Sequence, residues 1–135
     1  MPKPPTIAEL SWRDDLVFEA VSGTQRLIVD GNSTAGPSPV QMLVISLAGC
    51  MSADVAYILT KGHHPFRAIR ARIVADRAQN NPHRILKVTL TFSVEGALSP
   101  DAVARAVALS HEKYCSVWHS MREDIAFTTS YDVRR

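Results

Sequence analysis

The chain has 135 residues, 46% of them hydrophobic, and a formal net charge of +2 from 15 basic and 13 acidic residues. This length suits a single domain, residues 1–135, whose core can form without disulfide bonds. Because the charges of both signs are mixed along the sequence and leave no basic tract, nucleic acid is not expected as a partner.

The N-terminal segment reads as an arm followed by two strands. Residues 1–5 contain no apolar run, so we expect no signal peptide and a cytoplasmic protein. Residues 1–10 are expected to form a flexible or dimer-contacting arm. Two short apolar segments, Leu16–Val21 and Gln25–Asp30, follow it and are joined by a turn that contains Gly23, which predicts an antiparallel hairpin.

A long apolar helix is predicted from Pro39 to Lys61, with Ser38 as its N-cap and Gly62 after its last residue. Apolar residues on every side indicate a helix that is buried all round, either in a core or in a membrane. Polar residues within it, above all Asp54, and the lack of a second span argue against a membrane. A chain of this size could hardly bury such a helix alone, so we expect a homodimer with a shared core.

In the second half of the chain, apolar and polar residues first alternate as they do in strands, and a helical pattern follows. Strands are predicted over residues 66–76 and 85–95, and a helix that begins at Pro100, capped by Ser99, leads towards Cys115. A short helical stretch over residues 117–121 precedes a closing strand over residues 125–133. This order predicts an α+β fold in which one antiparallel sheet packs on a long, central, buried helix.

The two cysteines are the candidates for chemistry, because a pair of cysteines in a reducing compartment is rarely a structural bridge. Cys50 lies in the middle of the long helix, where it could be a buried hydrophobe or, if a cation favours its thiolate, a peroxide-reducing nucleophile. Asp54 lies one turn further on the same face. We interpret it as a supporting residue, either catalytic or a buried carboxylate tied to a backbone amide or a basic side chain.

Cys115 lies far downstream, and the spacing does not say whether the two sulfur atoms meet. If they do, a sulfenic acid on Cys50 would condense with Cys115 to a disulfide that an external thiol must reduce. A rival hypothesis is a zinc site of His111, Cys115 and His119, which would share a helical face if that helix continued unbroken. Surface histidines are the commoner explanation, so we expect no metal and no cofactor.

Two segments resemble the OsmC-like family of osmotically inducible and organic hydroperoxide resistance proteins. Residues 36–50, followed by Asp54 and by Ile58–Lys61, are similar to the family's central helix with its first cysteine. Residues 112–117 are similar to the segment that carries the second cysteine. The order of the predicted elements extends the resemblance over about residues 16–133.

The resemblance implies an intertwined homodimer whose long helices pack together. In the peroxidase branches of the family, the first cysteine attacks hydroperoxides and the second resolves the product, with electrons from dithiols such as lipoyl groups. Carried over to this sequence, Cys50 would be the peroxidatic cysteine and Cys115 the resolving one. The protein would then act in peroxide detoxification under oxidative stress.

The sequence also departs from those branches. They place a glutamate directly after the helix-starting proline, where this chain has Val40. They also use an arginine from the segment before the helix, but the only arginine between the first two predicted strands and Pro39 is Arg26, whose spacing does not fit. The chain looks closer to the uncharacterised branch with a Cys-x-x-x-Asp pattern, which lacks this pair. Two hypotheses follow: a thiol-dependent hydroperoxide reductase, or a stress-related dimeric module that binds a hydrophobic ligand and has no peroxidase activity.

Overall fold

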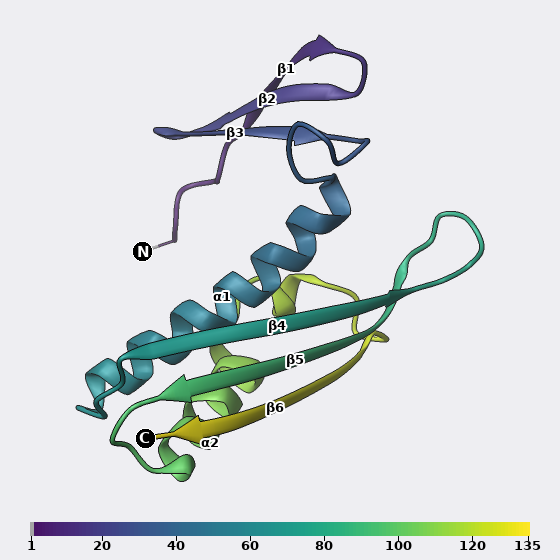
Figure 1. Ribbon diagram of the computed structural model, residues 1–135. Helices are drawn as coiled ribbons and strands as arrows, with labels where there is room; N and C mark the ends of the chain where they lie inside the picture. The colour runs from purple at the N-terminus through teal and green to yellow at the C-terminus, as the bar shows by residue number, and fades with distance from the viewer. Residues whose placement is uncertain (1) are drawn as a thin grey trace. The chain divides into compact units, whose positions relative to one another are not determined.

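The computed structural model describes residues 2–135, and Met1 lies outside the described residues (Figure 1). The chain falls into two compact units, one ending at Leu43 and one running from Val44 to Arg135. The long helix α1 (Pro39–Lys61) begins in the first unit and continues through the second. The single-domain organisation stays a prediction.

The N-terminal unit contains a three-stranded antiparallel sheet in the order β1-β2-β3. Its strands are β1 (Glu9–Asp14), β2 (Val17–Ser22) and β3 (Gln25–Asp30). The predicted hairpin is confirmed as β2 and β3, and Gly23 takes a φ of 60° in its turn. Strand β1 was not predicted, because it is exposed along its whole length. Within the described residues, the chain has no regular structure up to Ala8, and β1 then begins inside the segment that was expected to be the arm.

The loop between β3 and α1 is organised around the buried Asp30. Its carboxylate accepts hydrogen bonds from the backbone N–H groups of Asn32, Thr34 and Ala35, at 2.8, 3.2 and 2.9 Å. These donors, with Ala35 the strongest, hold the pKa of Asp30 below its usual value. The Asp30 carboxylate thus accepts the hydrogen bonds of loop N–H groups that would bind backbone carbonyl groups in a helix or a strand.

The predicted cap of α1 is confirmed in full. The backbone N–H of Gln41 donates to Ser38 Oγ at 3.2 Å, and the backbone N–H of Ser38 donates to Gln41 Oε1 at 2.9 Å. This reciprocal pair is a capping box, which satisfies two donors that the first turn of a helix otherwise leaves free.

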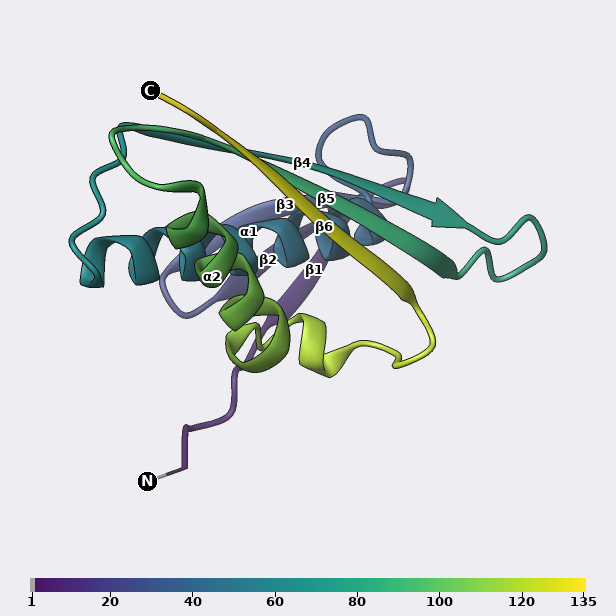
Figure 2. The ribbon, with the colours of Figure 1, turned by 90° about the horizontal axis from the view of Figure 1, so that it is seen from below.

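The C-terminal unit packs α1 and α2 (Pro100–Leu109) on the same side of a second three-stranded sheet (Figure 2). The sheet order is β4-β5-β6, with β4 (Ala68–Arg77), β5 (Ile85–Glu95) and β6 (Ala126–Arg134). Alternate residues of β5 are buried, as expected of a strand with one face on the core. The core of this unit is formed by Val88, Leu90, Phe92 and Val94 of β5, Leu47, Met51, Val55 and Leu59 of α1, and Val103, Ala106 and Val107 of α2.

The α+β class is confirmed, but the prediction of one antiparallel sheet is wrong. The chain forms two separate sheets, and β6 pairs with β5 in parallel, with Lys87 opposite Ala126 and Glu95 opposite Arg134. The physical reason is the connection between these strands. A chain that leaves β5, forms α2 and returns to the same sheet has made a crossover, and crossovers join parallel strands.

Within one chain, helix α1 is buried along one stripe only, as expected of a chain too small to cover the helix alone. The stripe repeats every four residues from Leu47 to Leu59, whereas Ile45 is 59% exposed and Tyr57 65% exposed. By length and composition α1 could also cross a membrane, a test that the core helix of a soluble protein passes too. Covering of the exposed residues by a second copy stays a prediction.

Candidate active site at the cysteine pair

Helix α1 places Cys50 directly beside the buried stripe. Leu47 and Met51 anchor this turn of the helix in the core, at 1% and 0% exposure, while the Cys50 side chain is half-buried. A rigid helix fixed by buried neighbours holds a reactive side chain in one position. The thiol of Cys50 is therefore both held and accessible, as a nucleophile must be.

The segment after α2 places Cys115. Upstream of it, Ser99 caps the start of α2, because its hydroxyl accepts a hydrogen bond from the N–H of Ala102 at 3.2 Å. After Leu109 the helix widens into one π-helical turn, η1 (Ser110–Tyr114), which is closed by a bond of 2.8 Å from the N–H of Cys115 to the carbonyl oxygen of Ser110. Single π-helical turns are frequent at functional sites.

Cys115 is fully buried, and its sulfur accepts a hydrogen bond from the backbone N–H of Trp118 at 3.4 Å. The pKa of the Cys115 thiol is raised to about 11, mainly by burial and to a smaller extent by the hydrogen bond and charge of Cys50, against the lowering effect of the Trp118 and Val117 N–H groups. Cys115 is therefore a neutral thiol at neutral pH. A neutral thiol can donate its proton in a hydrogen bond to Cys50.

The structure thus brings together the two cysteines whose meeting the sequence spacing left open. The two side chains lie close enough for Cys50 to raise the pKa of the Cys115 thiol, and both cysteines are free thiols. One sulfur is half-buried and the other fully buried, so a reagent from solvent reaches Cys50 first. This asymmetry suits an attacking cysteine backed by a second one.

Asp54 meets a partner that the sequence did not suggest. The hydroxyl of Ser110 donates a hydrogen bond of 2.7 Å to Asp54 Oδ2. The expected backbone amide or basic side chain is therefore replaced by a serine from the turn that precedes Cys115. Ser110 is 0% exposed, and a polar residue at the end of the buried stripe of α2 is the signal that could have found it.

The geometry does not favour the zinc alternative, because the helix does not continue unbroken. The backbone leaves the helical conformation at Cys115, and His119 Nε2 lies 3.0 Å from the carbonyl oxygen of His111. The His111 ring packs edge-on against Phe127 and Trp118 instead, with ring centroids 5.0 and 5.9 Å apart. Among residues 2–135 no group of three or more His, Cys, Asp or Glu side chains is placed to hold a metal ion.

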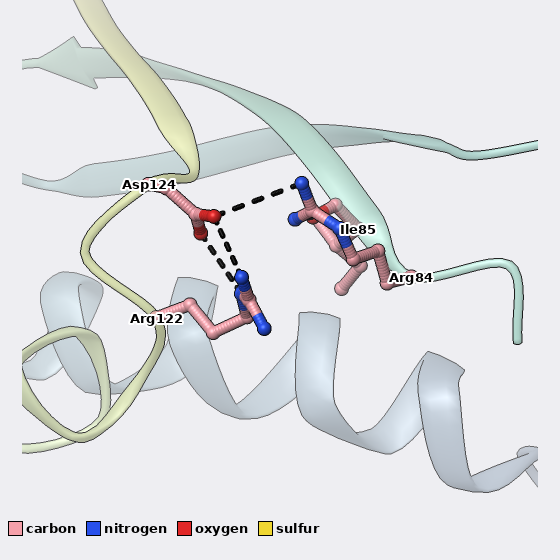
Figure 3. A network of polar contacts seen from close by, with 4 residues as sticks. All are labelled: Arg84, Ile85, Arg122 and Asp124. Atoms are coloured by element: carbon pink, nitrogen blue, oxygen red, sulfur yellow. Dashed lines mark hydrogen bonds and ion pairs between the residues drawn. The ribbon is translucent and has the colours of Figure 1, made fainter.

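The carboxylate of Asp124 binds two arginines, Arg84 directly before β5 and Arg122 in the loop before β6 (Figure 3). Arg122 binds Asp124 through two hydrogen bonds of 2.9 and 2.7 Å, and Arg84 Nη2 lies 3.7 Å from Asp124 Oδ2. The hydrogen bonds from Arg122 lower the pKa of Asp124 to about 2, with a smaller contribution from the charge of Arg84. The network ties the start of β5 to the loop before β6.

The candidate site is thus a pair of neighbouring thiols, one on the long helix and one on the crossover between β5 and β6 of a small α+β protein. A family model described as OsmC-like protein matches residues 30–130. The chain is 38% identical over 130 residues to Protein YhfA of Escherichia coli strain K12, with 93% of this chain and 96% of YhfA covered. The chain therefore belongs to the OsmC-like family.

Solved structures share the fold. A hypothetical protein from Aquifex aeolicus VF5 is 23% identical with a TM-score of 0.91, over 98% of both chains. A Legionella pneumophila protein described as an organic hydroperoxide resistance protein OsmC and predicted redox protein is 15% identical with a TM-score of 0.73, over 98% of this chain and 100% of its own. At these identities the likeness establishes the common fold.

Proposed function

We propose that this protein is a thiol-dependent reductase of organic hydroperoxides, in which Cys50 attacks the peroxide and Cys115 resolves the product. The single observation that carries the proposal is that a half-buried Cys50 lies near enough to a buried, protonated Cys115 to raise the pKa of its thiol. Family membership supports it, because relatives of the same fold are described as organic hydroperoxide resistance proteins.

The chemistry balances with these two side chains and one external reductant. The Cys50 thiolate attacks the distal peroxide oxygen, the O–O bond breaks, and the alkoxide that leaves takes up a proton to become the alcohol. The resulting Cys50 sulfenic acid condenses with the Cys115 thiol, which forms the disulfide and releases water. A dithiol, of which a lipoyl group is the expected example, then reduces the disulfide by thiol–disulfide exchange.

The proposal includes a homodimer in the cytoplasm. Exposed apolar residues on α1, such as Ile45 and Tyr57, support a second copy as the element that covers this helix. A reducing compartment supports the chemistry, because it supplies the thiols that reopen the disulfide. Light scattering of wild-type protein and of Ile45→Glu tests the assembly: a dimer that the substitution splits is expected, and a wild-type monomer would refute it.

Mass spectrometry tests the chemistry directly. Reduced protein is mixed with a small excess of cumene hydroperoxide, and free thiols are then alkylated. We expect wild type to lose two hydrogens and both alkylation sites, Cys115→Ser to give a sulfenic acid that dimedone traps, and Cys50→Ser to be unreactive. A wild-type protein without an intramolecular disulfide, or a Cys50→Ser variant that still consumes peroxide, would disprove the assignment.

The reductant is tested with the same protein. Oxidised wild type is offered dihydrolipoamide or glutathione at equal thiol concentration, and the return of free thiols is followed over time. A dithiol closes its own ring as it leaves, so dihydrolipoamide is expected to reduce the disulfide faster. Equal rates would remove the dithiol from the proposal and leave the peroxide chemistry intact.

A further inference from the structure

We propose that Asp54 determines the substrate class of the Cys50 site, so that uncharged organic hydroperoxides react and hydroperoxides that carry a carboxylate are turned away by repulsion. The inference rests on the proposed function and deepens it, because it names the peroxides that the same site accepts. Its physical basis is one negative charge, held in place one helical turn from the attacking sulfur.

Asp54 and Cys50 are neighbours on one face of α1. They lie four residues apart in a helix that runs unbroken from Pro39 to Lys61. Side chains with this spacing have Cβ atoms about 5–6 Å apart. Cys50 lies near enough to Cys115 to raise the pKa of its thiol, and Asp54 Oδ2 accepts the hydroxyl of Ser110 at 2.7 Å. Both side chains therefore face the segment after α2, through contacts made within one chain.

The charge of Asp54 has no counter-charge in the part of the chain that the structure describes. Within residues 2–135 its carboxylate forms no ion pair. Ser110, which holds it, is a fully buried residue with a neutral hydroxyl. A hydroxyl donor orients a carboxylate without cancelling its charge. A reagent that approaches the Cys50 sulfur therefore meets a fixed negative charge.

Coulomb's law gives the size of the expected effect. Two like unit charges about 6 Å apart slow a reaction about 3-fold in the dielectric of water, and about 100-fold at an effective dielectric constant of about 20, which is typical near a protein surface. Asp54 is half-buried. We therefore expect a carboxylate on the reagent to slow its reaction with Cys50 by about 10-fold, between these two limits.

Alkylation tests the charge effect without any peroxide chemistry. Cys115→Ser leaves Cys50 as the single thiol, and mass spectrometry follows its reaction with iodoacetamide and with iodoacetate. Both reagents lose iodide to the same thiolate, so a change in the thiolate fraction cancels in the ratio of their rates. We expect Asp54→Asn to lower the advantage of iodoacetamide about 10-fold. An unchanged ratio would overturn the proposal.

Two further variants separate charge from structure. The amide oxygen of Asp54→Asn can still accept the Ser110 hydroxyl, and Asp54→Glu keeps the charge, so Asp54→Glu should keep most of the preference for iodoacetamide. Asp76→Asn is the matched control, because Asp76 is an exposed carboxylate of β4. Circular dichroism and light scattering check the fold and assembly of each variant. A ratio that falls equally in Asp54→Glu or in Asp76→Asn would refute a role for the charge of Asp54.

The substrate class is tested with two matched peroxides on otherwise wild-type protein. Cumene hydroperoxide is compared with its para-carboxylate derivative, and disulfide formation is followed by mass spectrometry. We expect the uncharged peroxide to react about 10-fold faster, and Asp54→Asn to remove most of this difference. Equal rates in wild type would refute the substrate class and leave the peroxidase activity intact. If neither peroxide reacts, the proposed function fails and the substrate class fails with it, whereas the alkylation ratios still decide whether Asp54 repels anions.

Discussion

The hydroxyl of Ser110 donates a hydrogen bond of 2.7 Å to Asp54 Oδ2, and this bond joins the turn before Cys115 to the helix that carries Cys50. The carbonyl oxygen of the same serine accepts the N–H of Cys115 at 2.8 Å. Ser110 therefore holds Cys115 at the end of the π-helical turn and also links this turn to α1. The position of Cys115 beside Cys50 depends on a contact between two polar side chains.

Replacement of Ser110 should expose this dependence. Ser110→Ala leaves the Asp54 carboxylate without its hydroxyl donor in a part-buried site, which we expect to cost about 1–3 kcal/mol of unfolding free energy. Urea unfolding measures this loss, and the rate of disulfide formation under peroxide should fall with it. Ser116→Ala is the control, because Ser116 is exposed. Equal stabilities of the two variants would contradict the role of Ser110.

The raised pKa of Cys115 predicts a loss of stability in alkali. The unfolded thiol titrates near its usual value of about 8.5, whereas the folded one titrates at about 11, so the folded state binds the proton more tightly. This contribution is complete below the unfolded pKa and is lost as pH rises towards 11. Unfolding free energies of wild type and Cys115→Ala should therefore converge between pH 8 and pH 11, and a constant difference would contradict the prediction.

The Asp124 network predicts the opposite dependence in acid. The pKa of Asp124 is lowered to about 2, so its contribution is present above the usual carboxyl value and is lost as pH falls towards 2. Asp124→Asn should lower the melting temperature slightly at pH 7 and have no effect near pH 2, because the network is exposed to solvent. Glu123→Gln, an exposed neighbour, should leave both melting temperatures unchanged.

The elements and the fold class could be predicted from the sequence because their signals are local. Ser38 and Ser99 mark the starts of both helices, and the structure confirms both caps. The parallel pairing of β5 and β6 was missed because alternation identifies a strand without giving its direction. The direction of β6 follows instead from the helix predicted between the two strands, because a crossover through a helix joins parallel strands of one sheet.

The candidate site could be predicted only in part, because its contacts join residues far apart in the chain. The sequence singled out Cys50, Cys115 and Asp54 as candidates, and the structure places all three within one linked group of contacts. Ser110 was missed, since its place on the buried stripe of α2 indicates a buried polar residue but does not identify Asp54 as its partner. The π-helical turn before Cys115 was missed too, because such a turn has no sequence signature comparable to a cap.

Trp118 should report the redox state of the pair. Its backbone N–H donates to Cys115 Sγ at 3.4 Å, and its ring packs on Phe127 with centroids 4.4 Å apart. A disulfide with Cys50 fixes the Cys115 sulfur in a new bond, so the geometry around Trp118 has to adjust. In a Trp12→Phe background, which leaves Trp118 as the single tryptophan, we expect the emission to change when cumene hydroperoxide is added and to return with dihydrolipoamide.

The same measurement separates the disulfide from direct effects of peroxide. Cys50→Ser in the Trp12→Phe background cannot form the bond, so its emission should stay constant under the same treatment. Cys115→Ser should also lack the reversible change, because Cys50 then stops at the sulfenic acid. An emission change that persists in Cys50→Ser would show that peroxide alters Trp118 without the cysteine pair, and the coupling between Cys115 and the Trp118 backbone would have to be abandoned.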